Sequence, residues 1–153
     1  ILNIGKIDIS AVESLNKFGL KNFLKQVDYL SHDEVIIEQR RAILLLLLIN
    51  NTPNAKLILT GKIFEYLVSL TPIICIGPTD GDAANVIKET SCGSTFGFDE
   101  VDNLKDNILK LYQQFNKGEI TTTNSAINKY DRKYLTEKMS MLLNELYKDN
   151  SIT

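Results

Sequence analysis

Seven consecutive apolar residues, Ile43 to Ile49, constrain the fold of this chain more than any other stretch. The run is shorter than an ordinary buried helix, and polar segments lie on both sides of it. A continuous apolar run of this kind is typical of a strand that is covered on both faces. It therefore predicts a strand in the middle of a parallel sheet.

Short strands and amphipathic helices alternate around this run. Further strands are predicted at 1–5, 23–30, 72–76 and 94–98. Helices are expected to begin at cap residues or just after a glycine, and these starts are Ser10, Ser31, Lys62, Asp82, Asp99 and Asp131. Glycines placed to end helices are Gly19, Gly93 and Gly118. The alternation predicts an α/β, Rossmann-like fold with a mainly parallel sheet and helices on both faces.

The composition is that of an ordinary soluble domain. The chain has 153 residues, of which 44% are hydrophobic and 24% charged, enough for one domain with a real core. The net charge of -2 argues against a nucleic-acid partner held by phosphate neutralisation. The only cysteines, Cys75 and Cys92, lack metal-ligand spacing, and the simplest interpretation is free thiols in a reducing cytoplasm.

Two parts are expected along the chain. Residues 1–118 form the Rossmann-like domain, and residues 119–153 form a polar linker followed by a last helix. The apolar stripe of that helix consists of Leu135, Met139, Leu142, Leu143 and Leu146. We expect the stripe to pack on the same domain.

The stretch from Thr60 to Leu67 carries the candidate site. In a helix that begins near Lys62, the residues Lys62, Glu65 and Ser69 share one face. The core-facing residues would be Ile63, Phe64, Leu67 and Leu70. A cation and a carboxylate in a first turn that follows Gly61 suit a phosphorylated ligand with hydroxyl groups. The alternative is an exposed ion pair on a surface helix.

At this point the chain resembles the C-terminal domain of family 4 glycosyltransferases, which are two-domain GT-B enzymes. The residues that carry the resemblance are Gly61-Lys62-Ile63-Phe64-Glu65-Tyr66-Leu67, Pro72, Gly81-Asp82-Ala83-Ala84 and Glu89-Thr90. The similarity runs from Ile1 to about Leu146. It implies that the domain binds a nucleotide diphosphate sugar as donor, without a metal or another cofactor.

The resemblance also implies roles for single residues. Glu65 would accept from the ribose hydroxyls, and Lys62 would contact the diphosphate, with backbone N–H groups of Thr60 and Gly61 beside it. His32 would lie near the nucleotide base, although it could equally be a surface histidine; Ser31 is chiefly a helix cap. The family pattern has a second glutamate where this chain has Leu57. That difference leaves the identity of the donor sugar open.

The implied reaction is a retaining hexosyl transfer to a growing bacterial surface glycan, by an enzyme that is cytoplasmic or peripheral at the inner membrane. In the family, this domain begins with a strand and a helix that would precede Ile1. An acceptor-binding domain would come before that strand and helix. We therefore expect the chain alone to be inactive and at best a weak nucleotide binder. The strands beside the missing one would either close together or recruit another chain.

A partner-binding module of the flavodoxin or receiver type is the alternative function. Three features of the chain favour this alternative: its small size, its mild net charge and Leu57 in place of the glutamate. A receiver domain needs a phosphoacceptor aspartate at the end of a central strand, and here the strand ends in Asn50 and Asn51. No glycine-rich dinucleotide or Walker loop is present, which argues against a dehydrogenase or a P-loop enzyme.

Overall fold

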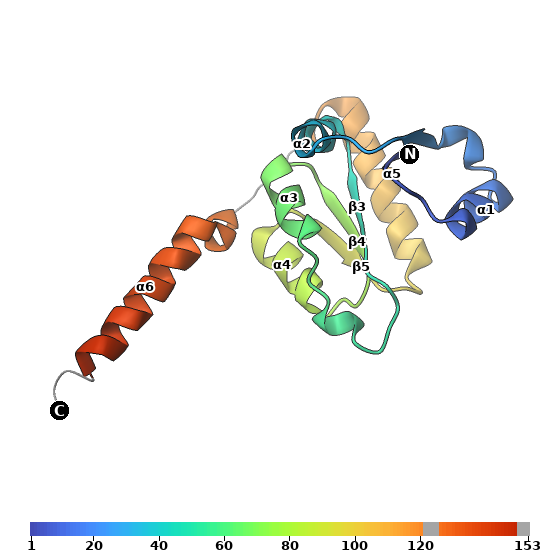
Figure 1. Cartoon of the computed structure of the whole chain (residues 1–153). Coiled ribbons are helices and arrows are strands. Elements are labelled where there is room, and N and C mark those ends of the chain that lie inside the picture. The colour runs from blue at the N-terminus through green and yellow to red at the C-terminus, as the bar shows by residue number, and fades with distance from the viewer. Residues whose placement is uncertain (121–125, 150–153) are drawn as a thin grey trace. The chain divides into compact units, whose positions relative to one another are not determined.

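The computed structural model describes residues 1–120 and 126–149, which belong to two compact units, Ile1–Arg41 and Ala42–Thr153. All the strands in the described part of the chain are parallel to their neighbours, and helices connect them (Figure 1). The prediction of an α/β, Rossmann-like fold is confirmed. The strands form two sheets, ordered β1-β2 and β3-β4-β5, and no described ladder joins them.

The first unit holds β1 (Leu2–Ile4), α1 (Ile9–Lys17), a 3-10 turn (Lys21–Phe23), β2 (Lys25–Val27) and α2 (His32–Arg41). Strand β2 is shorter than predicted at both ends: Phe23 belongs to the turn, and residues 28–30 make no ladder with β1. Gly19 follows α1 at φ 71°, as a helix-ending glycine should. The predicted cap Ser10 is wrong: Asp8 is the N-cap, and its carboxylate accepts from the Ser10 N–H at 2.8 Å.

The second unit begins with β3 (Leu45–Leu48), a 3-10 turn η2 (Ala55–Leu57), α3 (Lys62–Ser69) and β4 (Ile73–Ile76). It continues with α4 (Asp82–Thr90), β5 (Gly93–Phe96), α5 (Val101–Lys117), a 3-10 turn η3 (Ile127–Tyr130) and α6 (Arg132–Asp149). In Figure 1, α3 and α4 lie on one side of the three-stranded sheet and α5 on the other. The prediction of helices on both faces is therefore confirmed for this sheet.

The core of the second unit lies between the sheet and the helices α3 and α4. Leu45 and Leu47 of β3 and Ile73 and Cys75 of β4 face this layer. The helix residues that complete it are Ile63, Leu67, Ala83, Val86 and Ile87. Burial of such side chains supplies most of the stability of a domain of this size.

The opposite face of β3 does not match the prediction that both faces of the apolar run are covered. Leu46 and Leu48 are 50% and 60% exposed. They alternate with the buried Leu45 and Leu47 because successive side chains of a strand point to opposite faces of the sheet, and at the edge strand β3 only one of these faces is buried. A continuous apolar run shows that a strand is suited to burial on both faces. It does not show which helices cover those faces.

Two helix ends differ from prediction. Gly93 does not end α4; Ser91 does, at φ 54°, and Gly93 begins β5 instead. A Cβ at Gly93 would come within 1.9 Å of the Ile73 carbonyl oxygen, so only glycine fits this register. At the end of α3, Leu70 is exposed and adopts φ 61° rather than pointing into the core.

The long helix α5 ends at Gly118 as predicted. Its half-buried positions are Leu104, Asn107, Leu111 and Gln114. Four of its large apolar side chains are exposed: Val101, Ile108, Tyr112 and Phe115. The N-cap is Glu100 rather than Asp99, and the Glu100 carboxylate accepts from the Gly97 N–H at 2.7 Å.

The last helix, α6, is capped as predicted: Asp131 Oδ1 accepts from the N–H groups of Lys133 and Tyr134. Its side chains through residue 147 are exposed, including the whole predicted stripe. The predicted linker at 119–125 lies mostly outside the described residues. Among the described helices, none combines the length and apolar character needed to cross a bilayer.

Candidate functional site

The start of α3 contains four of the predicted site residues, Thr60, Gly61, Lys62 and Glu65. Gly61 occupies the N-cap position and has no side chain with which to accept from the first turn. Ile63 and Phe64 donate their N–H groups to the carbonyls of Thr60 and Gly61 in a tight turn. The helix start therefore presents backbone N–H groups and a positive dipole end without an internal side-chain cap.

The residues at this helix start differ in their exposure to solvent. Lys62 and Gly61 are exposed and Glu65 is half-buried one turn further on. No atom lies within 4 Å of the position that a Cβ at Gly61 would take, so a ligand can approach the backbone there. Ser69, predicted to share this face, is buried; its hydroxyl donates to the Tyr66 carbonyl at 2.7 Å and accepts from the Thr71 N–H.

Thr60 adds an unusual feature to the site. Its hydroxyl oxygen is buried and has no hydrogen-bond partner among the described residues. Buried hydroxyl groups are nearly always paired, because an unpaired one loses its hydrogen bonds to water without compensation. An unsatisfied donor one residue before Gly61 suits a group that accepts hydrogen bonds.

The loop that follows β3 and leads to α3 contacts the loop that follows β4. Lys56 Nζ and Asp80 Oδ2 are 2.5 Å apart, and this hydrogen bond lowers the pKa of Asp80. A Cβ at Gly81 would lie 3.0 Å from the Lys56 carbonyl oxygen, which shows how closely the two loops pack. The two loops are therefore neighbours, although the exposed ion pair itself contributes little to stability.

His32 and Ser31 belong to the first unit, at the start of α2. Ser31 is the predicted cap and forms a capping box with Glu34: the Ser31 N–H and hydroxyl donate to Glu34 Oε2 at 2.8 and 2.6 Å. These bonds lower the pKa of Glu34. The role of Ser31 as a cap is confirmed, and His32 is exposed in the first helical turn. Contact of either residue with a nucleotide base stays a prediction.

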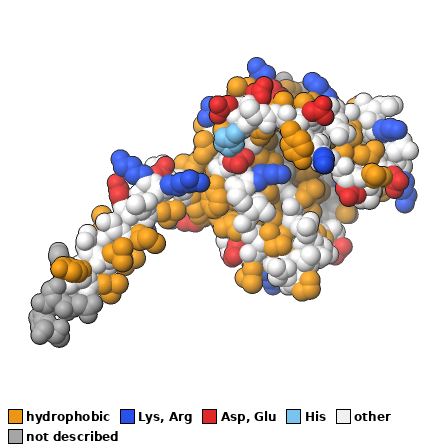
Figure 2. Space-filling model, in the orientation of Figure 1, with side chains coloured by type: hydrophobic (Ala, Val, Ile, Leu, Met, Phe, Trp, Pro, Cys, Tyr) orange, Lys and Arg blue, Asp and Glu red, His pale blue; other side chains and the backbone are white. Residues whose placement is uncertain are grey.

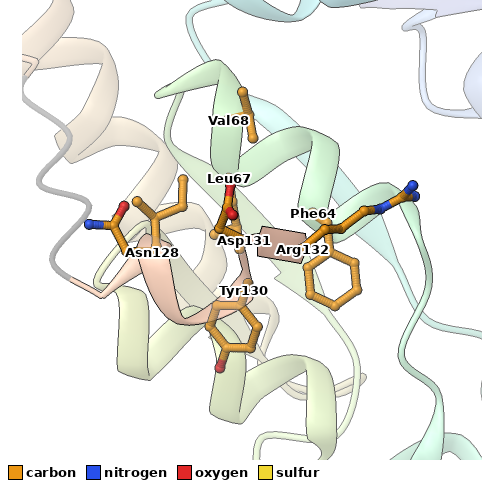
Figure 3. Close-up of a pocket in the computed structure, with 8 residues that line it drawn as sticks. Phe64, Leu67, Val68, Asn128, Tyr130, Asp131 and Arg132 are labelled. Carbon is orange, nitrogen blue, oxygen red and sulfur yellow. The ribbon is translucent and has the colours of Figure 1, made fainter. Parts of the chain in front are cut away.

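A cleft that the sequence did not predict lies on the other side of α3. It has a volume of about 320 Å³ and is lined by Phe64, Leu67, Val68, Ile127, Asn128, Tyr130, Asp131 and Arg132 (Figure 3). The ring centroids of Phe64 and Tyr130 are 5.7 Å apart, so η3 packs directly on α3. Since Phe64 follows Lys62 by two residues, the two side chains leave α3 in nearly opposite directions.

Glu89 of α4 holds η3 in place beside this cleft. Its carboxylate accepts from Lys129 Nζ and from the Tyr130 hydroxyl, each at 2.5 Å. Burial and this bond raise the pKa of Tyr130 to about 12. Glu89 belongs to the motif that carries the family resemblance, and its partners lie 40 and 41 residues away. No local pattern could have paired them.

Other chemistry finds little support in the described residues. No three or more His, Cys, Asp or Glu side chains are grouped there as metal ligands would be. Cys75 and Cys92 are buried free thiols, and burial raises the pKa of Cys75 to about 11. A thiol with so high a pKa is a poor nucleophile at neutral pH.

Comparisons with protein-family models, with curated proteins and with solved structures found no match to this chain.

Proposed function

We propose that this chain is the donor-binding part of a retaining glycosyltransferase that uses a nucleotide diphosphate sugar, as the family resemblance implies. The observation that carries the proposal is the start of α3. There an uncapped helix start, the exposed cation of Lys62 and the unsatisfied Thr60 hydroxyl occur within three consecutive residues. A diphosphate would provide acceptors for all three.

Each side chain has a distinct role in this proposal. Lys62 offsets the negative charge that develops on the diphosphate as the bond to the sugar breaks. The Gly61 and Lys62 N–H groups hold the phosphate oxygens, and the Thr60 hydroxyl donates to one of them. Glu65, one turn along the same helix, accepts from the ribose hydroxyls. The binding site for the acceptor glycan and the rest of the catalytic cleft would come from another domain of the enzyme.

The departure at Leu57 limits what the proposal says about the sugar. Leu57 lies in η2 and is 75% exposed, so it offers an apolar side chain where the family has a carboxylate. It cannot accept a hydrogen bond from a sugar hydroxyl. The proposal therefore concerns the nucleotide and its diphosphate, and leaves the hexose open.

The first experiment is a calorimetric titration of the chain with UDP, GDP and ADP. We expect weak, saturable binding that prefers one base. Glu65→Gln removes a charge-assisted acceptor for the ribose and should weaken binding at least about tenfold. The matched control is Glu137→Gln, at an exposed position of α6. No binding of any nucleotide, or equal binding by Glu65→Gln, would overturn the proposal and favour a partner-binding module.

A further inference from the structure

The helix α6 carries an apolar stripe that nothing in the described part of the chain covers. Leu135, Met139, Leu142 and Leu146 are between 50% and 64% exposed. Figure 2 shows hydrophobic side chains following one side of this helix. A helix of 18 residues gains most of its stability from packing its apolar face, because isolated helices of this length are marginal in water.

The spacing of the stripe is that of a coiled-coil seam. From Leu135 the steps to the next members are four, three and four residues, which places Leu135 and Leu142 at d and Met139 and Leu146 at a. The helix is about 27 Å long at 1.5 Å per residue, room for four such layers. Leu143, the fifth member of the stripe, lies at the adjacent e position and widens this seam on one side.

The start of α6 is held by contacts with α3 and α4, while its apolar seam is exposed. Asp131 caps the helix, and the preceding turn η3 is attached to the second unit through Glu89 and Phe64. The helix start is thereby held to α3 and α4, and the stripe lies beyond these contacts. A fixed start reduces the conformational entropy that α6 would lose on binding a partner.

Charges beside the seam select the partner and its direction. The g positions that flank the stripe are Lys138 and Glu145. In an antiparallel pair of identical helices, Leu135 meets Leu146 and Met139 meets Leu142. That register brings Lys138 of each copy opposite Glu145 of the other, twice by symmetry. A parallel pair would instead place Lys138 beside Leu143, so the charges would find no partner.

We propose that α6 is a self-association site, at which two copies of this chain pair through their α6 helices in antiparallel orientation. The interface consists of four apolar layers and two Lys138–Glu145 pairs. Four layers are few for a coiled coil, so the dimer should be weak and should depend on concentration. Lys138 Nζ, which lies 5.0 Å from the Tyr134 ring, remains within the exposed part of the helix and can reach across the seam.

Sedimentation equilibrium over a range of concentrations tests the proposal on the whole chain. We expect a reversible monomer–dimer equilibrium. Lys138→Glu should raise the dimer dissociation constant about tenfold, because it sets like charges opposite each other at two places. Adding Glu145→Lys to that variant should restore the original constant. Circular dichroism would verify that both exposed substitutions leave the helix content unchanged.

Two results would overturn the proposal. A monomer at every concentration would show that the stripe does not bind a second copy. A dimer that Lys138→Glu leaves unchanged would show that the contact lies elsewhere or that the helices run parallel. Because neither Lys138 nor Glu145 belongs to the proposed donor site, nucleotide binding should be the same in all variants.

Discussion

The starts of α2 and α3 both contain predicted site residues, yet they are built in opposite ways. At α2 the Ser31–Glu34 capping box uses side chains of the helix itself to satisfy the first turn. At α3 the N-cap is Gly61, which has no side chain to accept, and the next residue is a lysine. The first arrangement stabilises a helix, while the second leaves polar groups for something else to bind.

This difference distinguishes residues that stabilise the start of a helix from residues that helix stability does not explain. A cap that satisfies its own helix explains why serine and glutamate occur where they do at α2. A lysine in the first turn opposes the helix dipole, so stability does not explain Lys62. We therefore infer that the sequence at α3 serves a ligand, and that the sequence around Ser31 mainly serves the fold.

The largest effect should come from how each helix is attached to the core. Ile63 in α3 is fully buried, whereas Ile37 in α2 is 48% exposed. Ile63→Ala should lower the free energy of unfolding by about 3 kcal/mol, through lost burial and the cavity it leaves. Ile37→Ala should cost less than about 1 kcal/mol. Urea unfolding of both variants measures this; similar losses would show that α3 is not the better-anchored helix.

The next effect concerns binding and stability at Lys62. Lys62→Ala should weaken nucleotide binding about tenfold, because it removes a charged donor to the diphosphate. The same change should leave stability unchanged or raise it by a few tenths of a kcal/mol, since the lysine opposes the dipole. Titration and unfolding are measured on one preparation. A loss of stability with unchanged affinity would mean that Lys62 is structural.

The opposite result is expected at the start of α2. Ser31→Ala should lower the stability of the first unit by about 1 kcal/mol, because the first turn loses its cap. Its effect on nucleotide affinity should be small. Hydrogen exchange of the α2 amides, measured beside the titration, separates the two. Ser31→Thr keeps the hydroxyl and is the control. Weaker binding at unchanged stability would instead assign Ser31 to the nucleotide site.

The smallest effect is the change in stability of the α2 start at acidic pH. The Ser31 bonds hold the pKa of Glu34 below its ordinary value of 4.5. A group with a lowered pKa stabilises the folded state at pH above about 4.5, and this contribution is lost as the pH falls through the lower folded value. The protection factors of the α2 amides, which correct the exchange rates for the intrinsic effect of pH, should therefore fall below about pH 4.5, and Glu34→Gln should remove that dependence. A pH response that survives Glu34→Gln would point to another group.

Much of the fold could be predicted because it depends on local patterns. The cap at Ser31 marked the start of α2, and Gly61 with Lys62 marked the start of α3. Asp131 and Gly118 marked helix boundaries for the same reason, since caps act on residues within one turn.

Features that depend on distant residues were missed. The sequence pattern predicts a helix end at Gly93, while its true constraint is the Ile73 backbone across the sheet. The exposure of Leu46 depends on what packs over its face of β3, and the cleft at Phe64 depends on a turn more than 60 residues further along the chain. No spacing in the sequence specifies such neighbours. The buried, unpaired Thr60 hydroxyl was likewise visible only in the structure.

The proposed diphosphate site at the start of α3 is tested most directly by following backbone amide resonances of the chain during titration with UDP, and with uridine as the control without phosphates. We expect the Gly61 and Lys62 amide signals to shift saturably with UDP and to stay in place with uridine, because the diphosphate accepts from these N–H groups. Signals that remain unchanged at Gly61 and Lys62 while UDP binds, or that respond equally to uridine, would contradict a diphosphate site at this helix start.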